Sequence, residues 1–192
     1  MLSNLLQRFA GTPDEVLRKI QMGGLVRSAR LVSNVLGNPP PDADEMPEWI
    51  EEILMAATRR ICRYDDEAMP DPEDCGSLEA TKTFMDGMPP QTQLEFQSLM
   101  VLLEVSPYVF GPVAGRFTQL DGKQQDQVLK GWETASLVPK RTGFRAIKSV
   151  VMMGYWSRPE TWPAIGYSIH DNPGVPSPQK NHWKQREEPA DG

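Results

Sequence analysis

Few residues of this 192-residue chain have the type and spacing that chemistry requires. The two histidines, His170 and His182, lie near the C-terminal end, which argues against a histidine-based metal site. The two cysteines, Cys62 and Cys75, lack zinc spacing, and neither has a partner histidine in the part expected to be ordered. Two cysteines are too few for a disulfide framework, so we expect two free thiols, one of them on a buried helix face.

The other groups that take part in catalysis do not converge either. The pair Gly23-Gly24 falls within an expected helix and follows no strand, so it is not a phosphate-binding loop. Carboxylates are abundant, but Glu51-Glu52 and the acidic run 65–67 have the pattern of solvated faces and loops. Because no nucleophile, base and stabilising group occur together, the sequence predicts no catalytic, cofactor-binding or metal-binding residue in this chain.

The most informative segment is residues 154–167, with the sequence GYWSRPETWPAIGY. It combines four aromatic rings with Pro159, Pro163 and two glycines. Proline lacks an N–H and pushes the preceding residue toward extended geometry, so we expect an ordered aromatic loop rather than a helix or a tail. Such a loop either closes the core of its own chain or presents rigid anchors to a partner.

The elements that would position these groups are helices. Apolar residues recur at helical spacing in six segments that are bounded by start and stop signals. The expected helices span residues 12–36, 44–63, 77–86, 90–104, 121–135 and 141–153. Gly37 is expected to end the first of them, Pro107 to break helical structure after the fourth, and Asp121 to cap the fifth. Residues 65–76 are expected to form an exposed loop. No alternating run bounded by hairpin turns predicts a strand. We therefore predict an all-α fold, an irregular bundle of about five or six helices followed by the aromatic and proline-rich loop and an extended tail.

The chain is expected to form one helical domain over residues 1–170. Residues 171–192 contain four prolines, mixed charge and almost no apolar side chains. Such a segment buries too little surface to offset its ordering entropy, so it is predicted to be flexible or ordered by a partner. Trp183 is the exception in this tail, and it is either a lone anchor for a partner or an exposed aromatic residue.

Composition excludes some classes of protein. The net charge is −6 and the isoelectric point is about 5.0, which argues against a nucleic-acid-binding protein. No apolar run reaches the ~20 residues that span a bilayer. The first residues do not have the pattern of a signal peptide, so the expected compartment is the cytoplasm. A peripheral membrane or scaffold protein is an alternative, with an N-terminal apolar face formed by Leu2, Leu5, Leu6 and Phe9.

Two groupings on the last expected helix have more than one interpretation. Arg141, Arg145 and Lys148 follow one another at spacings of four and three. They form either a solvated face or a cationic patch that faces an acidic partner or a lipid surface. Met152-Met153 either fills gaps in the core or forms an adaptable contact surface.

A longer pattern covers residues 117–167. Its members are Phe117, Leu120-Asp121, Gln125, Leu129, Trp132, Ser136, Arg141, Phe144, Ile147-Lys148, Tyr155, Ser157, Pro159 and the run TWPAIGY over residues 161–167. This pattern resembles the small-subunit family of gluconate dehydrogenase, and the matching short regions attached to some bacterial long-chain alcohol oxidoreductases of the glucose–methanol–choline type. Those families have two helices joined by a short loop, then a tyrosine–serine–proline turn and a Trp-Pro-x-Ile-Gly-Tyr ending.

The resemblance implies a non-catalytic accessory subunit that binds and stabilises a large oxidoreductase subunit, which carries FAD and oxidises an alcohol or a sugar. This chain would bind no cofactor itself and would not be an enzyme by itself. It departs from the family pattern at Trp156, where relatives have tyrosine, and at residues 168–171, where relatives have Asp-Gly-Pro. The expected partner-interface residues are Tyr155, Trp156, Ser157, Pro159, Trp162, Pro163, Ile165, Gly166, Tyr167 and Trp183.

Within that set we expect Trp162 and Ile165 to point inward, and Tyr155, Trp156 and Tyr167 to point toward the partner. Export together with a signal-bearing partner would place the chain in the periplasm instead of the cytoplasm. A free-standing helical enzyme that acts on an apolar substrate in a bundle cavity is the alternative in another functional class.

Overall fold

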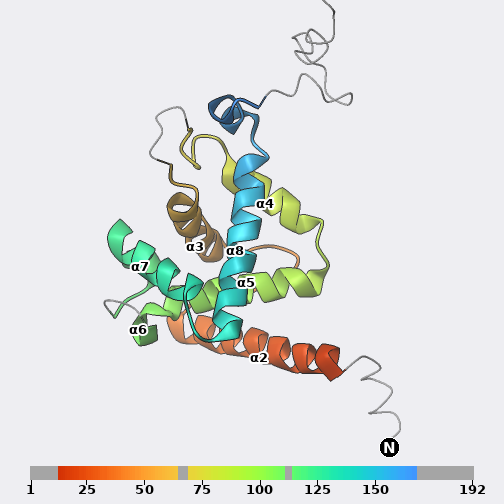
Figure 1. Cartoon of the computed structure of the whole chain (residues 1–192). Coiled ribbons are helices and arrows are strands. Elements are labelled where there is room, and N and C mark those ends of the chain that lie inside the picture. The colour runs from red at the N-terminus through yellow and green to blue at the C-terminus, as the bar shows by residue number, and fades with distance from the viewer. Residues whose placement is uncertain (1–12, 65–68, 111–113, 168–192) are drawn as a thin grey trace, which may run out of the picture.

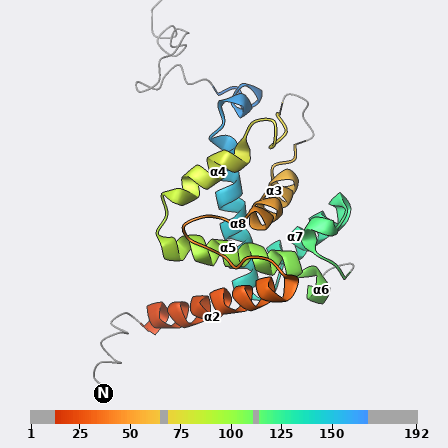
Figure 2. The same cartoon turned by 180° about the vertical axis from the view of Figure 1, so that it is seen from behind.

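The computed structural model describes residues 13–64, 69–110 and 114–167. Over these residues the chain is helical and contains no strand, which confirms the predicted all-α class (Figures 1 and 2). The α-helices are α2 (Pro13–Leu36), α3 (Glu48–Ile61), α4 (Ser77–Asp86), α5 (Pro90–Val105), α6 (Pro107–Phe110), α7 (Gly122–Glu133) and α8 (Val138–Trp156). Three 3₁₀ turns complete the described part: η1 (Phe117–Gln119), η2 (Pro159–Thr161) and η3 (Pro163–Ile165).

Local sequence explains where several helices begin and end. Asp121 caps α7, because its side chain accepts a bond from the Gln124 amide while the Gln124 side chain accepts one from the Asp121 amide. Gly37 follows α2 with φ +73°, a left-handed conformation that suits glycine at a helix end. Helix α5 begins at Pro90, where the missing N–H removes no helical hydrogen bond.

Helix α8 is the central element of the bundle. It packs against α3, α4, α5 and α7, and its buried face contributes Phe144, Ile147, Val151 and Tyr155 to the core. Helix α2 packs mainly on α5, and lies on the far side of α5 from α3 and α4 (Figures 1 and 2). The start of α8 therefore lies at the α2 side of the molecule, and its C-terminal end, with η2 and η3, lies at the opposite side (Figure 1).

The structure corrects three local predictions. Helix α8 continues to Trp156, so residues 154–156 are helical and only the rest of the aromatic segment is a loop, formed by η2 and η3. Helix α6, with only four residues, was not predicted because Pro107 was interpreted as a break. The predicted exposed loop 65–76 is not exposed throughout, because Pro72 and Cys75 are buried.

The tail 171–192 with Trp183, the apolar face at residues 2–9 and both histidines lie outside the described residues. The division of the chain at residue 170 therefore stays a prediction. Among the described residues, no helix combines the length and apolarity that would let it cross a membrane.

Candidate partner-binding site

Three aromatic rings meet where α3 and α8 end. Tyr64 stacks on Tyr155 with ring centroids 6.1 Å apart, and Trp156 meets both rings edge-on, at 5.6 Å from Tyr64 and 5.4 Å from Tyr155. Tyr155 is completely buried, and its hydroxyl donates a 2.8 Å hydrogen bond to the Pro70 carbonyl oxygen. This bond ties α8 to the segment that precedes α4.

A second ring pair extends this cluster beyond the helix. The Trp162 indole N–H donates a 2.8 Å bond to the Trp156 carbonyl oxygen at the C-terminus of α8. The Tyr167 ring meets Trp162 edge-on at 5.5 Å, and the Tyr167 amide donates to the Trp162 carbonyl oxygen at 3.0 Å. Gly166 lets the chain turn back so that Tyr167 reaches Trp162, because it has φ +69°, a conformation that other residues rarely adopt. We call Tyr64, Tyr155, Trp156, Trp162 and Tyr167 the aromatic end.

The exposure of these side chains differs from the prediction at two positions. Tyr155 was expected to face a partner but is buried, because its ring and hydroxyl close the core between α8 and Pro70. Ile165 was expected to point inward but is 55% exposed, because η3 places it on the outer side of the turn. Tyr167 is 53% exposed, as expected for a side chain that points outward, and Trp156 and Trp162 are both half-buried.

The remaining expected interface residues lie at the surface around these rings. Ser157, Pro159, Pro163 and Gly166 are all exposed. Tyr64 was missed by the sequence reasoning, since it is a single ring far from residues 154–167 and only the packing of α3 on α8 brings it there. Its side chain is 40% exposed, so it adds to the open surface of the aromatic end.

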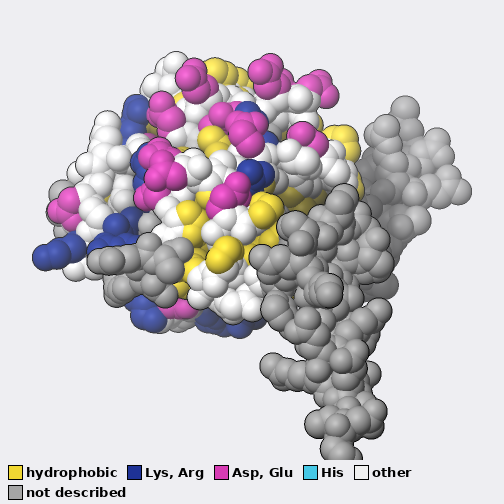
Figure 3. Space-filling model, turned by 90° about the horizontal axis from the view of Figure 1, so that it is seen from above, with side chains coloured by type: hydrophobic (Ala, Val, Ile, Leu, Met, Phe, Trp, Pro, Cys, Tyr) yellow, Lys and Arg dark blue, Asp and Glu magenta, His cyan; other side chains and the backbone are white. Residues whose placement is uncertain are grey.

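Seen from above, apolar side chains gather in the middle of the face that contains the C-terminal end of α8 (Figure 3). Carboxylates lie mainly in the upper part of Figure 3, and lysines and arginines lie toward its left and lower edges. Two ion pairs belong to this part of the chain: Arg59 with Glu73, and Arg158 with Glu160 at 3.6 Å. The Arg158 Nε is buried and has no hydrogen-bond partner among the described atoms. The Glu160 carboxylate, 3.6 Å away, balances the positive charge of this guanidinium. An apolar centre with a charged border is the composition of a protein–protein interface.

The groups that could react at this end are held in their neutral forms. Cys62 and Cys75 are free thiols, as expected, and both are buried. Burial raises the pKa of Cys62 to about 12, with a smaller contribution from the nearby Cys75 thiol. Burial likewise raises the pKa of Tyr155 to about 12. A thiol in this state is not a nucleophile at neutral pH.

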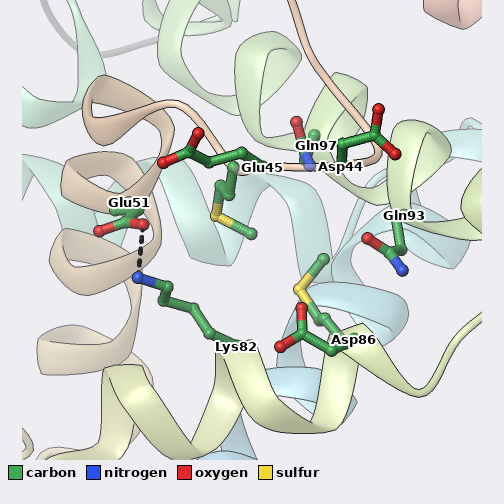
Figure 4. A pocket seen from close by; sticks show the side chains of 9 residues that line it. Asp44, Glu45, Glu51, Lys82, Asp86, Gln93 and Gln97 are labelled. Atoms are coloured by element: carbon green, nitrogen blue, oxygen red, sulfur yellow. Dashed lines mark ion pairs between the residues drawn. The ribbon is translucent and has the colours of Figure 1, made fainter.

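A small cavity of about 210 Å³ lies between α3, α4 and α5, away from the aromatic end (Figure 4). Its lining consists of Asp44, Glu45, Met46, Glu51, Lys82, Met85, Asp86, Gln93 and Gln97. The Lys82 ammonium lies 2.8 Å from the Glu51 carboxylate, which raises the pKa of Lys82 and keeps it charged. The Gln97 amide accepts from and donates to the Asp42 backbone.

Lys82 and Glu51 are therefore paired with each other and Gln97 with the backbone, and the charged Lys82 is not available as a nucleophile. Sequence reasoning missed the cavity, because its residues come from three helices and a loop with no shared motif. Over the part of the chain that the structure describes, no three His, Cys, Asp or Glu side chains are grouped as a metal ion would require.

Comparisons of the chain with protein-family models, with curated proteins and with solved structures found no match.

Proposed function

We propose that this chain is a non-catalytic accessory subunit that binds and stabilises a large FAD-dependent alcohol or sugar oxidoreductase through its aromatic end. The observation that carries the proposal is that Ile165 and Tyr167 are exposed on a turn that is held rigidly against the end of α8. Trp162 ties this turn to the end of α8, and Tyr155 ties α8 to Pro70. Rigid, exposed rings lose little conformational entropy on binding, which is what interface anchors need.

The chemistry of the partner comes from the sequence resemblance of residues 117–167 to small subunits of flavin oxidoreductases. In this proposal the partner supplies the FAD and the redox chemistry, and this chain supplies contact area. The neutral thiols and the paired Lys82 of this chain are consistent with that division, because neither is prepared for catalysis at neutral pH. The alternative hypothesis is that the chain is a free-standing enzyme. It predicts that this chain alone oxidises an alcohol with an artificial electron acceptor.

The test is co-expression with each glucose–methanol–choline-type flavoprotein of the source genome. We expect one of them to co-purify in fixed stoichiometry with FAD, while this chain alone binds no flavin. Tyr167→Ala should weaken the complex about 30-fold, the loss of about 2 kcal/mol that is typical of a central aromatic anchor. A matched control is Tyr108→Ala, since Tyr108 on α6 is 54% exposed but lies outside the aromatic end. Failure of every flavoprotein to bind, or equal loss with both variants, would refute the proposal.

A further inference from the structure

Among the residues whose side chains the structure describes, the large apolar ones that are strongly exposed fall into two groups at opposite ends of α8. Tyr64, Met153, Ile165 and Tyr167 belong to the aromatic end or its border. The other six lie near the end of α2, on α6 and at the start of α8, and we call them the base surface: Leu31, Val35, Tyr108, Val109, Leu137 and Val138. Their exposures run from 54% to 86%, so the fold of the described residues leaves them uncovered.

The elements of the base surface are neighbours in space. Helix α6 follows α5 directly and lies beside the C-terminal end of α2 in both views (Figures 1 and 2). The Trp132 indole N–H donates a 3.0 Å bond to the Ser106 hydroxyl, which joins the end of α7 to the α5–α6 junction. Leu137 and Val138 follow α7 by a few residues. The six apolar side chains are therefore brought to one end of the molecule.

Helix α2 has apolar residues on two sides. Ala29 is buried against the body of the molecule and Val32 packs against the core, whereas Leu31 is 68% and Val35 is 86% exposed. Leu31 and Val35 are four residues apart, so they lie one above the other on the outer face of the helix. A helix that covers the body with one face and exposes leucine and valine on the other has a second surface to bury.

Charge separates the base surface from the rest of the molecule. Residues 13–38, 106–110 and 114–148, which form this half, contain 11 lysines and arginines and five acidic residues. The remaining described residues, 39–64, 69–105 and 149–167, contain 5 basic and 14 acidic residues. Arg27 and Arg30 on α2 and Arg145 on α8 are exposed at this end, and they form no ion pair with another described residue.

From this combination we propose that the base surface docks on an anionic lipid surface. Exposed aliphatic side chains and a tyrosine would enter the interface between headgroups and acyl chains, and the arginines would meet the lipid phosphates and carboxylates. An aliphatic and basic surface is complementary to an anionic bilayer, whereas the acidic opposite end would be repelled by it. The docking surface is separate from the aromatic end, so the proposal does not depend on the proposed function.

The test is sedimentation of the full chain with vesicles of phosphatidylcholine alone, or of phosphatidylcholine with one-third phosphatidylserine. We expect the wild type to pellet with the anionic vesicles and to be released by salt. Arg27→Glu should weaken this binding about 30-fold, because it removes one favourable charge and adds one repulsive charge, each worth roughly fivefold. Arg63→Glu is the matched control, since Arg63 is also an exposed arginine but belongs to the acidic half, and it should change binding little.

The apolar contribution is tested separately by Val35→Ser and Tyr108→Ala, both at exposed positions. Each should weaken vesicle binding at least threefold, and Tyr167→Ala should not. The proposal is overturned if the wild type stays in the supernatant, if Arg63→Glu is as harmful as Arg27→Glu, or if the apolar variants bind like the wild type. Loss of flavoprotein binding or of self-association in Val35→Ser, with vesicle binding unchanged, would instead assign this surface to a protein and also overturn it.

Discussion

Replacing Gly154 by alanine should destabilise the protein, because α4 crosses α8 at this residue without room for a side chain. An ideal Cβ at Gly154 would overlap the Thr81 hydroxyl oxygen, and it would lie 2.9 Å from Thr81 Cβ and 3.0 Å from the Ser77 carbonyl oxygen. Thr81 is completely buried, and its hydroxyl donates a 2.8 Å bond to the same Ser77 carbonyl. The clash therefore involves backbone and a fixed side chain, and α4 must move away from α8 to relieve it.

The magnitude follows from three contributions. Overpacking of a core costs about 1–3 kcal/mol, and a clash with backbone belongs at the upper limit, about 3 kcal/mol. Disturbing the Thr81–Ser77 hydrogen bond costs about 1 kcal/mol. Alanine is a better helix former than glycine by about 1 kcal/mol, which offsets part of the loss. We expect a net decrease of about 3 kcal/mol in the free energy of unfolding, a large share of the ~5–15 kcal/mol typical of a domain.

Urea unfolding followed by far-ultraviolet circular dichroism measures this change. Gly131→Ala is the control, because Gly131 lies in α7 and an added Cβ meets nothing within 4 Å. It should leave the stability unchanged or raise it by up to about 1 kcal/mol. The double variant Gly154→Ala/Thr81→Ala should recover part of the loss, because the two sites are in contact. If Gly154→Ala unfolds at the same urea concentration as the wild type, the close packing of α4 on α8 is wrong.

Three further predictions concern single groups. Asp121→Ala should lower the free energy of unfolding by about 1 kcal/mol by removing the cap of α7, whereas Asp121→Asn should retain most of it, and equal urea midpoints for the two variants would contradict this. Tyr155→Phe should cost about 1 kcal/mol at neutral pH through loss of the bond to Pro70, and an unchanged midpoint would show that the bond does not contribute. Stability should fall as the pH rises above about 9, because the pKa of Cys62 in the folded chain is about 12 against 9.0 for an unperturbed thiol, so the folded state keeps a proton that the unfolded state releases. The slope for this thiol is up to about 1.4 kcal/mol per pH unit, and Cys62→Ala should remove that part of the slope in urea midpoints measured between about pH 8 and pH 11.

The helices could be predicted from the sequence because their signals are local. The predicted helix over residues 77–86 matches α4 at both ends, and the predicted caps at Asp121 and Gly37 are those of the structure. The errors came where a local signal was interpreted too strictly. Pro107 was taken to end helical structure although proline is tolerated in a first turn, which is where it stands in α6. Likewise Pro159 ended the helix only at the residues just before it, so Gly154 and Trp156 stayed in α8.

The candidate site was less predictable, since the direction of a ring depends on neighbours that are distant in sequence. Composition identified residues 154–167 as the aromatic segment, but it did not reveal that Tyr155 would find the Pro70 carbonyl oxygen. A buried tyrosine hydroxyl needs a partner, so the direction of Tyr155 was decided by a hydrogen bond that only the tertiary structure supplies. The same holds for Tyr64, which joined the cluster through the packing of α3 on α8.

The position of α8 gives the two proposed surfaces a common physical basis. A helix of 19 residues rises about 28 Å, so the base surface and the aromatic end are separated by most of its length. Phe144, Ile147 and Val151 bury one face of this helix along that distance, and Gly154 lets α4 approach it closely. Because α8 is packed in this way, the distance between its two ends is fixed, since bending the helix would break close-packed contacts. A chain without a reactive thiol or a free lysine in its cavity can still determine where a partner enzyme sits relative to a lipid surface, and that task requires rigidity rather than chemistry.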